Sequence, residues 1–71
     1  MNRKTDAVDI IIPIYNGYED LQLCIPSVKK YTDLSKHRLI LINDCSPDER
    51  IAPYLDSLAE EHIFVLHNEK N

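Results

Sequence analysis

The sequence contains a single glycine, Gly17, among its 71 residues. The dinucleotide fingerprint G-x-G-x-x-G and the P-loop both need several glycines, because their backbones must approach the phosphates closely. Both motifs are therefore excluded, and with them the usual ways of cradling a phosphate. The two cysteines, Cys24 and Cys45, form no C-x-x-C pair, so metal binding through them is not expected. We expect both thiols to be reduced and buried, as free cysteines often are.

Basic charge and long apolar runs are also scarce. Twelve acidic residues against eight basic ones give a formal net charge of -4, and no run of Lys and Arg exceeds two residues. This balance disfavours binding to a phosphate backbone, so no nucleic-acid partner is expected. The apolar runs are four or five residues long, whereas a helix needs roughly 20 residues to span a bilayer. No signal-peptide core follows residues 1–6, so we expect a cytoplasmic protein without a membrane segment.

What is present is the composition of an ordinary folded protein. Apolar residues make up 44% of the chain and charged residues 28%. A chain of this length holds one domain at most and buries only roughly 60% of the surface that its unfolded form exposes. Residues 1–7 are polar and show no period, so they predict a disordered leader. The folded part is expected over residues 8–71.

Three apolar segments predict strands. Residues 8–14, 38–43 and 63–66 are rich in Ile, Leu and Val, and the first is closed by proline and glycine. The unbroken apolar run of the second segment is typical of a parallel strand covered on both faces. Thirty residues separate the starts of the first two segments, which is the length of a β-α-β unit. The expected fold class is α/β, with a parallel sheet in β-α-β-α-β order.

Two helices are predicted between these strands. The first spans residues 19–31, because apolar residues recur there at helical spacing: Leu21, Cys24, Ile25 and Val28. Pro26 should kink or split this helix, since it removes a backbone hydrogen bond. The second helix has two candidate starts. The sequence S-P-D-E at 46–49 has the pattern of a capping box, but Pro53 would then lie in the interior, so a start near Ala52 stays open. Its sheet-facing residues are expected to be Ile51, Leu55 and Leu58.

The helices of such a fold leave one face of the sheet bare. With three strands laid down in one direction, both crossover helices fall on the same face. On the other face about half a dozen Ile, Leu and Val side chains would stay wet, and each forfeits roughly 1.5–3 kcal/mol. The sum is comparable to the stability of an ordinary domain, about 5–15 kcal/mol. We therefore expect either the first part of a larger fold or a subunit whose open face is covered by a partner or second copy.

Ligands of open parallel sheets bind outside the carboxyl ends of the strands. Tyr15 follows the first strand there, and Asp44 follows the second. A ring from one loop and a carboxylate from the next suit a flat heterocycle that bears N–H donors, because the ring stacks and the carboxylate accepts. A plainer interpretation fits equally well: a partly buried tyrosine, a turn at Asn16-Gly17 and a loop-supporting aspartate. None of the three histidines has metal-ligand spacing or is expected to be catalytic.

Four blocks, in order, resemble the opening of a family 2 glycosyltransferase with the GT-A fold. They are I-I-P-I-Y-N-G at 11–17, L-x-x-C-I-x-S-V at 21–28, L-I-N-D-C-S at 41–46 and V-L-x-N-E-K-N at 65–71. The resemblance covers residues 8–71 and implies the first, incomplete part of a Rossmann-like GT-A fold. It also implies a nucleotide sugar, a UDP-sugar or similar, as the ligand.

The resemblance carries over to particular positions. The nucleotide-binding residues that it implies are Pro13, Tyr15, Asn16 and Asp44, and Asp44 matches the carboxylate that accepts from the base. Asn43 stands where the family usually has an aspartate. The final residue, Asn71, looks like the start of the family's next motif.

The same resemblance shows what the 71 residues lack. They contain no D-x-D, the motif through which the family binds Mg or Mn, and the family's catalytic base and acceptor region lie further downstream. We therefore expect no cofactor, metal site or catalytic residue within this chain, and no sugar transfer by the chain alone. A non-catalytic module that docks its open sheet face on a partner is the alternative. A receiver-like signalling fragment ranks last, because it would carry an acidic cluster where this chain has Pro13 and Tyr15.

Overall fold

The computed structural model describes residues 7–69. Its five elements alternate along the chain as β1 (Asp9–Ile14), α1 (Tyr18–Tyr31), β2 (Arg38–Asp44), α2 (Ile51–Asp56) and β3 (Ile63–Asn68). All three strands are parallel and form one sheet in the order β1-β2-β3. The predicted fold class is confirmed. Of the expected leader only Ala7 falls within the described residues, and Asn71 lies outside them as well.

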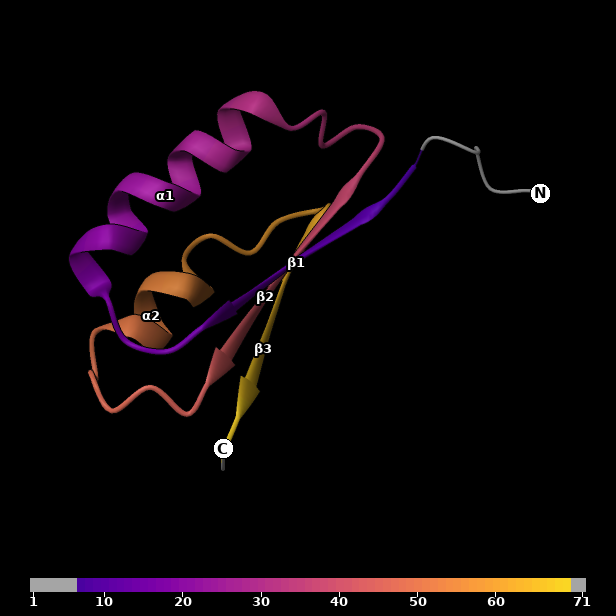
Figure 1. The fold of residues 1–71 in the computed structure, drawn as a ribbon. Coiled ribbons are helices and arrows are strands. Elements are labelled where there is room, and N and C mark those ends of the chain that lie inside the picture. Colours follow the sequence, from indigo (N-terminus) through magenta and orange to yellow (C-terminus); the bar gives the residue numbers. More distant parts are fainter. Residues whose placement is uncertain (1–6, 70–71) are drawn as a thin grey trace.

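The strand register brings the carboxyl ends of the three strands to one edge of the sheet. Ile14 of β1 pairs with Asn43 of β2, and Asn43 pairs with His67 of β3. Figure 1 shows the strands running side by side in the same direction, with α1 and α2 on one side of them. The loops after β1 and β2 both leave from this end of the sheet, which we call the carboxyl edge.

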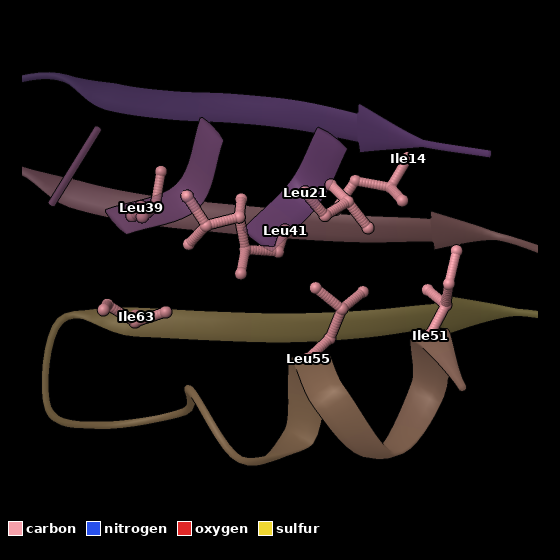
Figure 2. Close-up of a cluster of buried hydrophobic side chains, with 8 residues drawn as sticks. Ile14, Leu21, Leu39, Leu41, Ile51, Leu55 and Ile63 are labelled. Carbon is pink, nitrogen blue, oxygen red and sulfur yellow. The ribbon is translucent and has the colours of Figure 1, made fainter. Parts of the chain in front are cut away.

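The face of the sheet under the two helices, the covered face, holds the hydrophobic core. Leu39 and Leu41 of β2 lie at its centre with no exposed surface. Figure 2 shows the side chains of α1 and α2 directed at the strands, so that both helices and all three strands share one cluster. The buried members are Ile14, Leu21, Ile25, Leu39, Leu41, Ile51, Leu55 and Ile63. Most of the apolar residues predicted to form the sheet-facing stripes of the two helices therefore pack in this core.

Helix α1 departs from expectation at two positions. It continues through Pro26 as one α-helix of 14 residues, so a split there is wrong. Pro26 and Gln22 are both exposed, so the Gln22 carbonyl that loses its partner can bond to water instead. Cys24 is exposed and not buried as predicted, because it lies on the flank of the stripe and α1 meets the sheet through Leu21 and Ile25.

Helix α2 begins at Ile51, and its N-cap residue, Arg50, makes no side-chain capping bond. The predicted capping box at 46–49 is therefore wrong, while the later start is confirmed to within one residue. Pro53 is the third residue of α2. It is tolerated there because the first N–H groups of a helix have no intrahelical partner. Ile51 and Leu55 are fully buried as expected, and Leu58 packs against the same cluster.

The opposite side of the sheet, the open face, is apolar and is covered by none of the described residues. Two rows of paired residues cross it from β1 to β3: Ile11, Ile40 and Phe64, then Pro13, Ile42 and Leu66. Ile11 is 58% exposed, Phe64 43% and Leu66 53%. Arg38 and Asp9 close the amino end of this face with a bidentate ion pair of 2.8 Å. The prediction of a bare apolar face is confirmed for residues 7–69.

Candidate functional site

The first loop at the carboxyl edge joins β1 to α1 through Tyr15, Asn16 and Gly17. Asn16 and Gly17 both have left-handed backbones, with φ of 59° and 78°. Asparagine and glycine tolerate this region better than other residues. A methyl group added at Gly17 would meet only the Cβ of Asp20, at an ordinary 4.0 Å. Glycine is therefore favoured here by its backbone conformation and not by lack of space.

Asn16 ties this loop to the loop between β2 and α2. Its backbone N–H donates to Oγ of Ser46 at 3.0 Å, and its side-chain Oδ1 accepts from the backbone N–H of Asp48 at 3.0 Å. The hydroxyl predicted to cap α2 is thus used between loops. Local sequence pattern could not predict these two bonds, because Ser46 and Asp48 lie 30 and 32 residues from Asn16 in the chain.

Asn43, near the end of β2, anchors the loop between β2 and α2. Asn43 is 6% exposed, and its Oδ1 accepts from the backbone N–H of Ser46 at 3.1 Å. The next residues turn sharply, since Cys45 also has a left-handed backbone, with φ of 55°. The half-buried Cys45 thiol donates to the carbonyl of Glu69 at 3.2 Å. Specific hydrogen bonds therefore fix the conformation of both loops.

The structure gathers three of the four predicted nucleotide-binding residues around one hollow. Pro13, Tyr15 and Asn16 line an open depression of about 330 Å³ between the end of β1 and the start of α1. Tyr15 is 57% exposed. Asp44 does not line this hollow. Asp44 is the last residue of the neighbouring strand, β2, and lies one residue beyond the pair formed by Ile14 and Asn43; Tyr15 lies one residue beyond the same pair, directly after β1.

The Asp44 carboxylate is half-buried and accepts a long hydrogen bond of 3.5 Å from the side-chain amide of Asn68. A carboxylate can accept about four hydrogen bonds, so Asp44 keeps acceptor capacity for a ligand. The ring of Tyr15, directly after β1, and the carboxylate of Asp44, the last residue of β2, lie at the ends of adjacent strands. This arrangement offers a flat apolar surface beside a hydrogen-bond acceptor.

A charged cluster borders the edge on the helix side. Arg50 binds Asp48 at 2.7 Å and lies 4.2 Å from the ring centre of Tyr18, and it reaches Glu19 at 3.4 Å. Hydrogen bonds from the Arg50 side chain, then from its backbone N–H, lower the pKa of Asp48 to about 2. Tyr18 in turn meets Tyr54 edge-on at 5.7 Å. The cluster joins α1 to α2 and to the loop that leads from β2 into α2.

Two other hollows, of about 310 and 380 Å³, lie at the opposite, amino edge of the sheet. Both are lined by Ser35 and His62. Among residues 7–69, no group of three or more His, Cys, Asp or Glu side chains could hold a metal ion. No helix in this part of the chain is long and apolar enough to cross a membrane.

Comparison with known proteins decides the family. The family model described as "Glycosyl transferase family 2" matches residues 9–71, nearly the whole chain. The chain belongs to glycosyltransferase family 2. Its β-α-β-α-β order and three-stranded parallel sheet match the start of the Rossmann-like GT-A fold. No curated protein and no solved structure gives a significant match.

Sequence reasoning missed one residue of the carboxyl edge. His67 was expected to follow the third strand, but it lies within β3 and binds Asn43 on one side and Asp56 on the other. The available signal was its parity: His67 lies two residues after Val65 and four after Ile63, so it shares their face of the strand. A polar residue on that face needs a partner.

Proposed function

We propose that the chain recognises the nucleotide of a nucleotide-diphospho-sugar donor, a UDP-sugar or similar, in a transfer of sugar to an acceptor hydroxyl. One observation carries the proposal: an exposed ring, Tyr15, and a half-buried carboxylate, Asp44, stand at adjacent positions of the carboxyl edge. Membership of glycosyltransferase family 2 supports this choice of ligand.

Each side chain has a distinct role in this proposal. The ring of Tyr15 stacks on the flat face of the base, and Pro13 extends the apolar surface beside it. The carboxylate of Asp44 accepts a hydrogen bond from a ring N–H, such as that of uracil. Asn16 holds the two loops together through its bond to Asp48, and its side-chain NH₂ group can donate to the ligand.

Titration of the chain with UDP, followed by NMR or calorimetry, tests the proposal. Asp44→Ala should weaken binding by about tenfold or more, because a hydrogen bond to a charged group contributes roughly 1.5–3 kcal/mol. Tyr15→Ala should weaken it by a similar factor through lost stacking. Two matched controls, Glu61→Gln and Tyr31→Ala, remove an exposed carboxylate and an exposed ring away from this edge and should leave affinity unchanged. Equal affinity for wild type and Asp44→Ala would refute the assignment.

We further propose that the 71-residue chain binds the donor without transferring the sugar. An inverting transfer needs a group that stabilises the leaving diphosphate and a base that activates the acceptor. The sequence has no D-x-D, and the described residues hold no candidate metal cluster. Incubation of the isolated chain with nucleotide sugars and Mg or Mn should therefore give no glycosylated product, and any transfer would overturn this part of the proposal.

A second candidate function, a non-catalytic docking module, is favoured by the open face. Exposed apolar side chains are gathered there in two rows, and contiguous apolar patches of this kind mark interaction surfaces. This candidate predicts an oligomer or complex in solution and no gain in thermal stability on adding UDP. The nucleotide proposal predicts a UDP-dependent rise in melting temperature, so one thermal titration separates the two.

A further inference from the structure

A chain of polar side chains crosses the covered face at the carboxyl edge. Asp56 of α2 contacts His67 of β3 through Oδ1 and Nε2 at 2.8 Å, and Nδ1 of His67 contacts Nδ2 of Asn43 of β2 at 3.0 Å. Asn43 is nearly fully buried, whereas His67 and Asp56 are partly exposed. We call these three residues the Asp56–His67–Asn43 relay.

A backbone group at one end of the relay, the N–H of Ser46, determines which atom donates in each hydrogen bond of the relay. The N–H of Ser46 can only donate, and it donates to Oδ1 of Asn43. The other side-chain atom of Asn43 is therefore its NH₂ group, which can only donate, so Nδ1 of His67 must accept. The proton of neutral His67 then sits on Nε2 and is donated to the carboxylate of Asp56.

The relay continues into both loops of the carboxyl edge. Ser46, whose N–H is bound by Asn43, uses its hydroxyl to hold the N–H of Asn16. Asn16 and Cys45 have left-handed backbones, and non-glycine residues keep this conformation only when the surrounding structure holds it. Asp44 lies between the anchored Asn43 and the strained Cys45. Its position therefore depends on how firmly the Asn43 amide is oriented.

We propose that His67 is a positioning residue of the nucleotide site. In its Nε2–H tautomer, which donates to Asp56, His67 orients the Asn43 amide, and that amide holds the loop in which Asp44 faces the ligand. His67 itself touches no ligand in this scheme. What it positions rests on the proposed function above, whereas the tautomer and the loop anchoring rest on the geometry alone. An exposed His–Asp pair by itself would contribute little to stability, so the importance of His67 lies in orientation.

Imidazole ¹⁵N shifts of the full chain test the tautomer at neutral pH. The expected result is a protonated Nε2 and an unprotonated Nδ1 for His67. A wild-type His67 that is protonated on Nδ1 would overturn the proposal.

A second arm measures the effect on the loop and on UDP binding. His67→Phe should speed amide exchange at Ser46 and weaken UDP binding by about two- to tenfold, the equivalent of one neutral hydrogen bond. His67→Gln keeps one acceptor and one donor and should restore most of both. His37→Phe, at the amino edge, is the matched control and should change neither.

The two proposals fail in different ways. If UDP binds neither wild type nor variants, the proposed function is wrong, and the ¹⁵N shifts and Ser46 exchange still decide the role of His67. If wild type binds UDP and His67→Phe binds it equally well with unchanged Ser46 exchange, His67 positions nothing and the inference is refuted.

Discussion

The two faces of the sheet are built from the same three strands but differ in solvent exposure: one is buried and the other is open to solvent. On the covered face Leu39 and Leu41 have no exposed surface, while on the open face Ile11 and Leu66 are more than half exposed. Alternate residues of one strand thus differ in burial although their composition is similar. Apolar residues on both faces of a strand indicate that burial of either face would be favourable. Which face is buried depends on where the neighbouring helices pack.

The largest expected effect comes from truncating the covered face. Leu41→Ala should lower the free energy of unfolding by about 2–5 kcal/mol, because it removes buried contacts and leaves a cavity. Urea denaturation followed by circular dichroism measures this change. Leu66→Ala, the same change on the open face, should cost about 1 kcal/mol or less because the side chain is already half in water. Equal losses from the two variants would show that the open face is covered in solution.

A smaller effect is expected from making the open face polar. The double substitution of Ile11 and Leu66 by threonine should change stability by less than about 1 kcal/mol, since surface changes are usually small and threonine suits strands. It should also reduce self-association, measured by sedimentation over a range of concentrations. A variant that associates as strongly as wild type would argue against this face as an interaction surface. Leu23→Thr, on the exposed side of α1, is the control and should leave association unchanged.

The smallest expected effect on stability comes from the ion pair between Asp48 and Arg50 in the charged cluster. The pKa of Asp48 is lowered to about 2 by hydrogen bonds from Arg50, against an unfolded value of about 3.9. A lowered pKa means that the pair stabilises the folded chain above about pH 4, and that this contribution is lost as the pH falls toward 2. Carboxyl ¹³C shifts measured between pH 5 and 2 should give the low midpoint directly. Arg50→Gln should move that midpoint back toward the ordinary value.

Much of the fold follows from local pattern. The three strands, the first helix and the parallel order were predictable because short apolar runs and a helical stripe recur at the spacing of a β-α-β unit. The bare face was predictable for the same reason, since two crossover helices can cover only one side of three strands. Cys24 was not, because its burial depends on how far α1 is rotated about its axis against the sheet.

The site was predictable in part. The sequence indicates which residues follow each strand, and the structure has Tyr15 and Asp44 at neighbouring strand ends. Their nucleotide-binding role stays a prediction. The bonds that hold the loops were not predictable, because Ser46 binds a residue 30 positions away and His67 binds one 24 positions away. Local pattern favoured a capping box for Ser46, and tertiary contact offered its hydroxyl a different donor.

By itself, the sequence determined the alternation of strands and helices, the absence of glycine-rich phosphate loops and the family of the chain. These depend on residue type and on short spacings. The tertiary structure alone decided which thiol is exposed, where α2 begins and how Asn16, Ser46, Asn43 and His67 share their hydrogen bonds. The physical reason is that a polar group bonds to whichever partner the fold brings within about 3 Å, and that partner can lie anywhere along the chain.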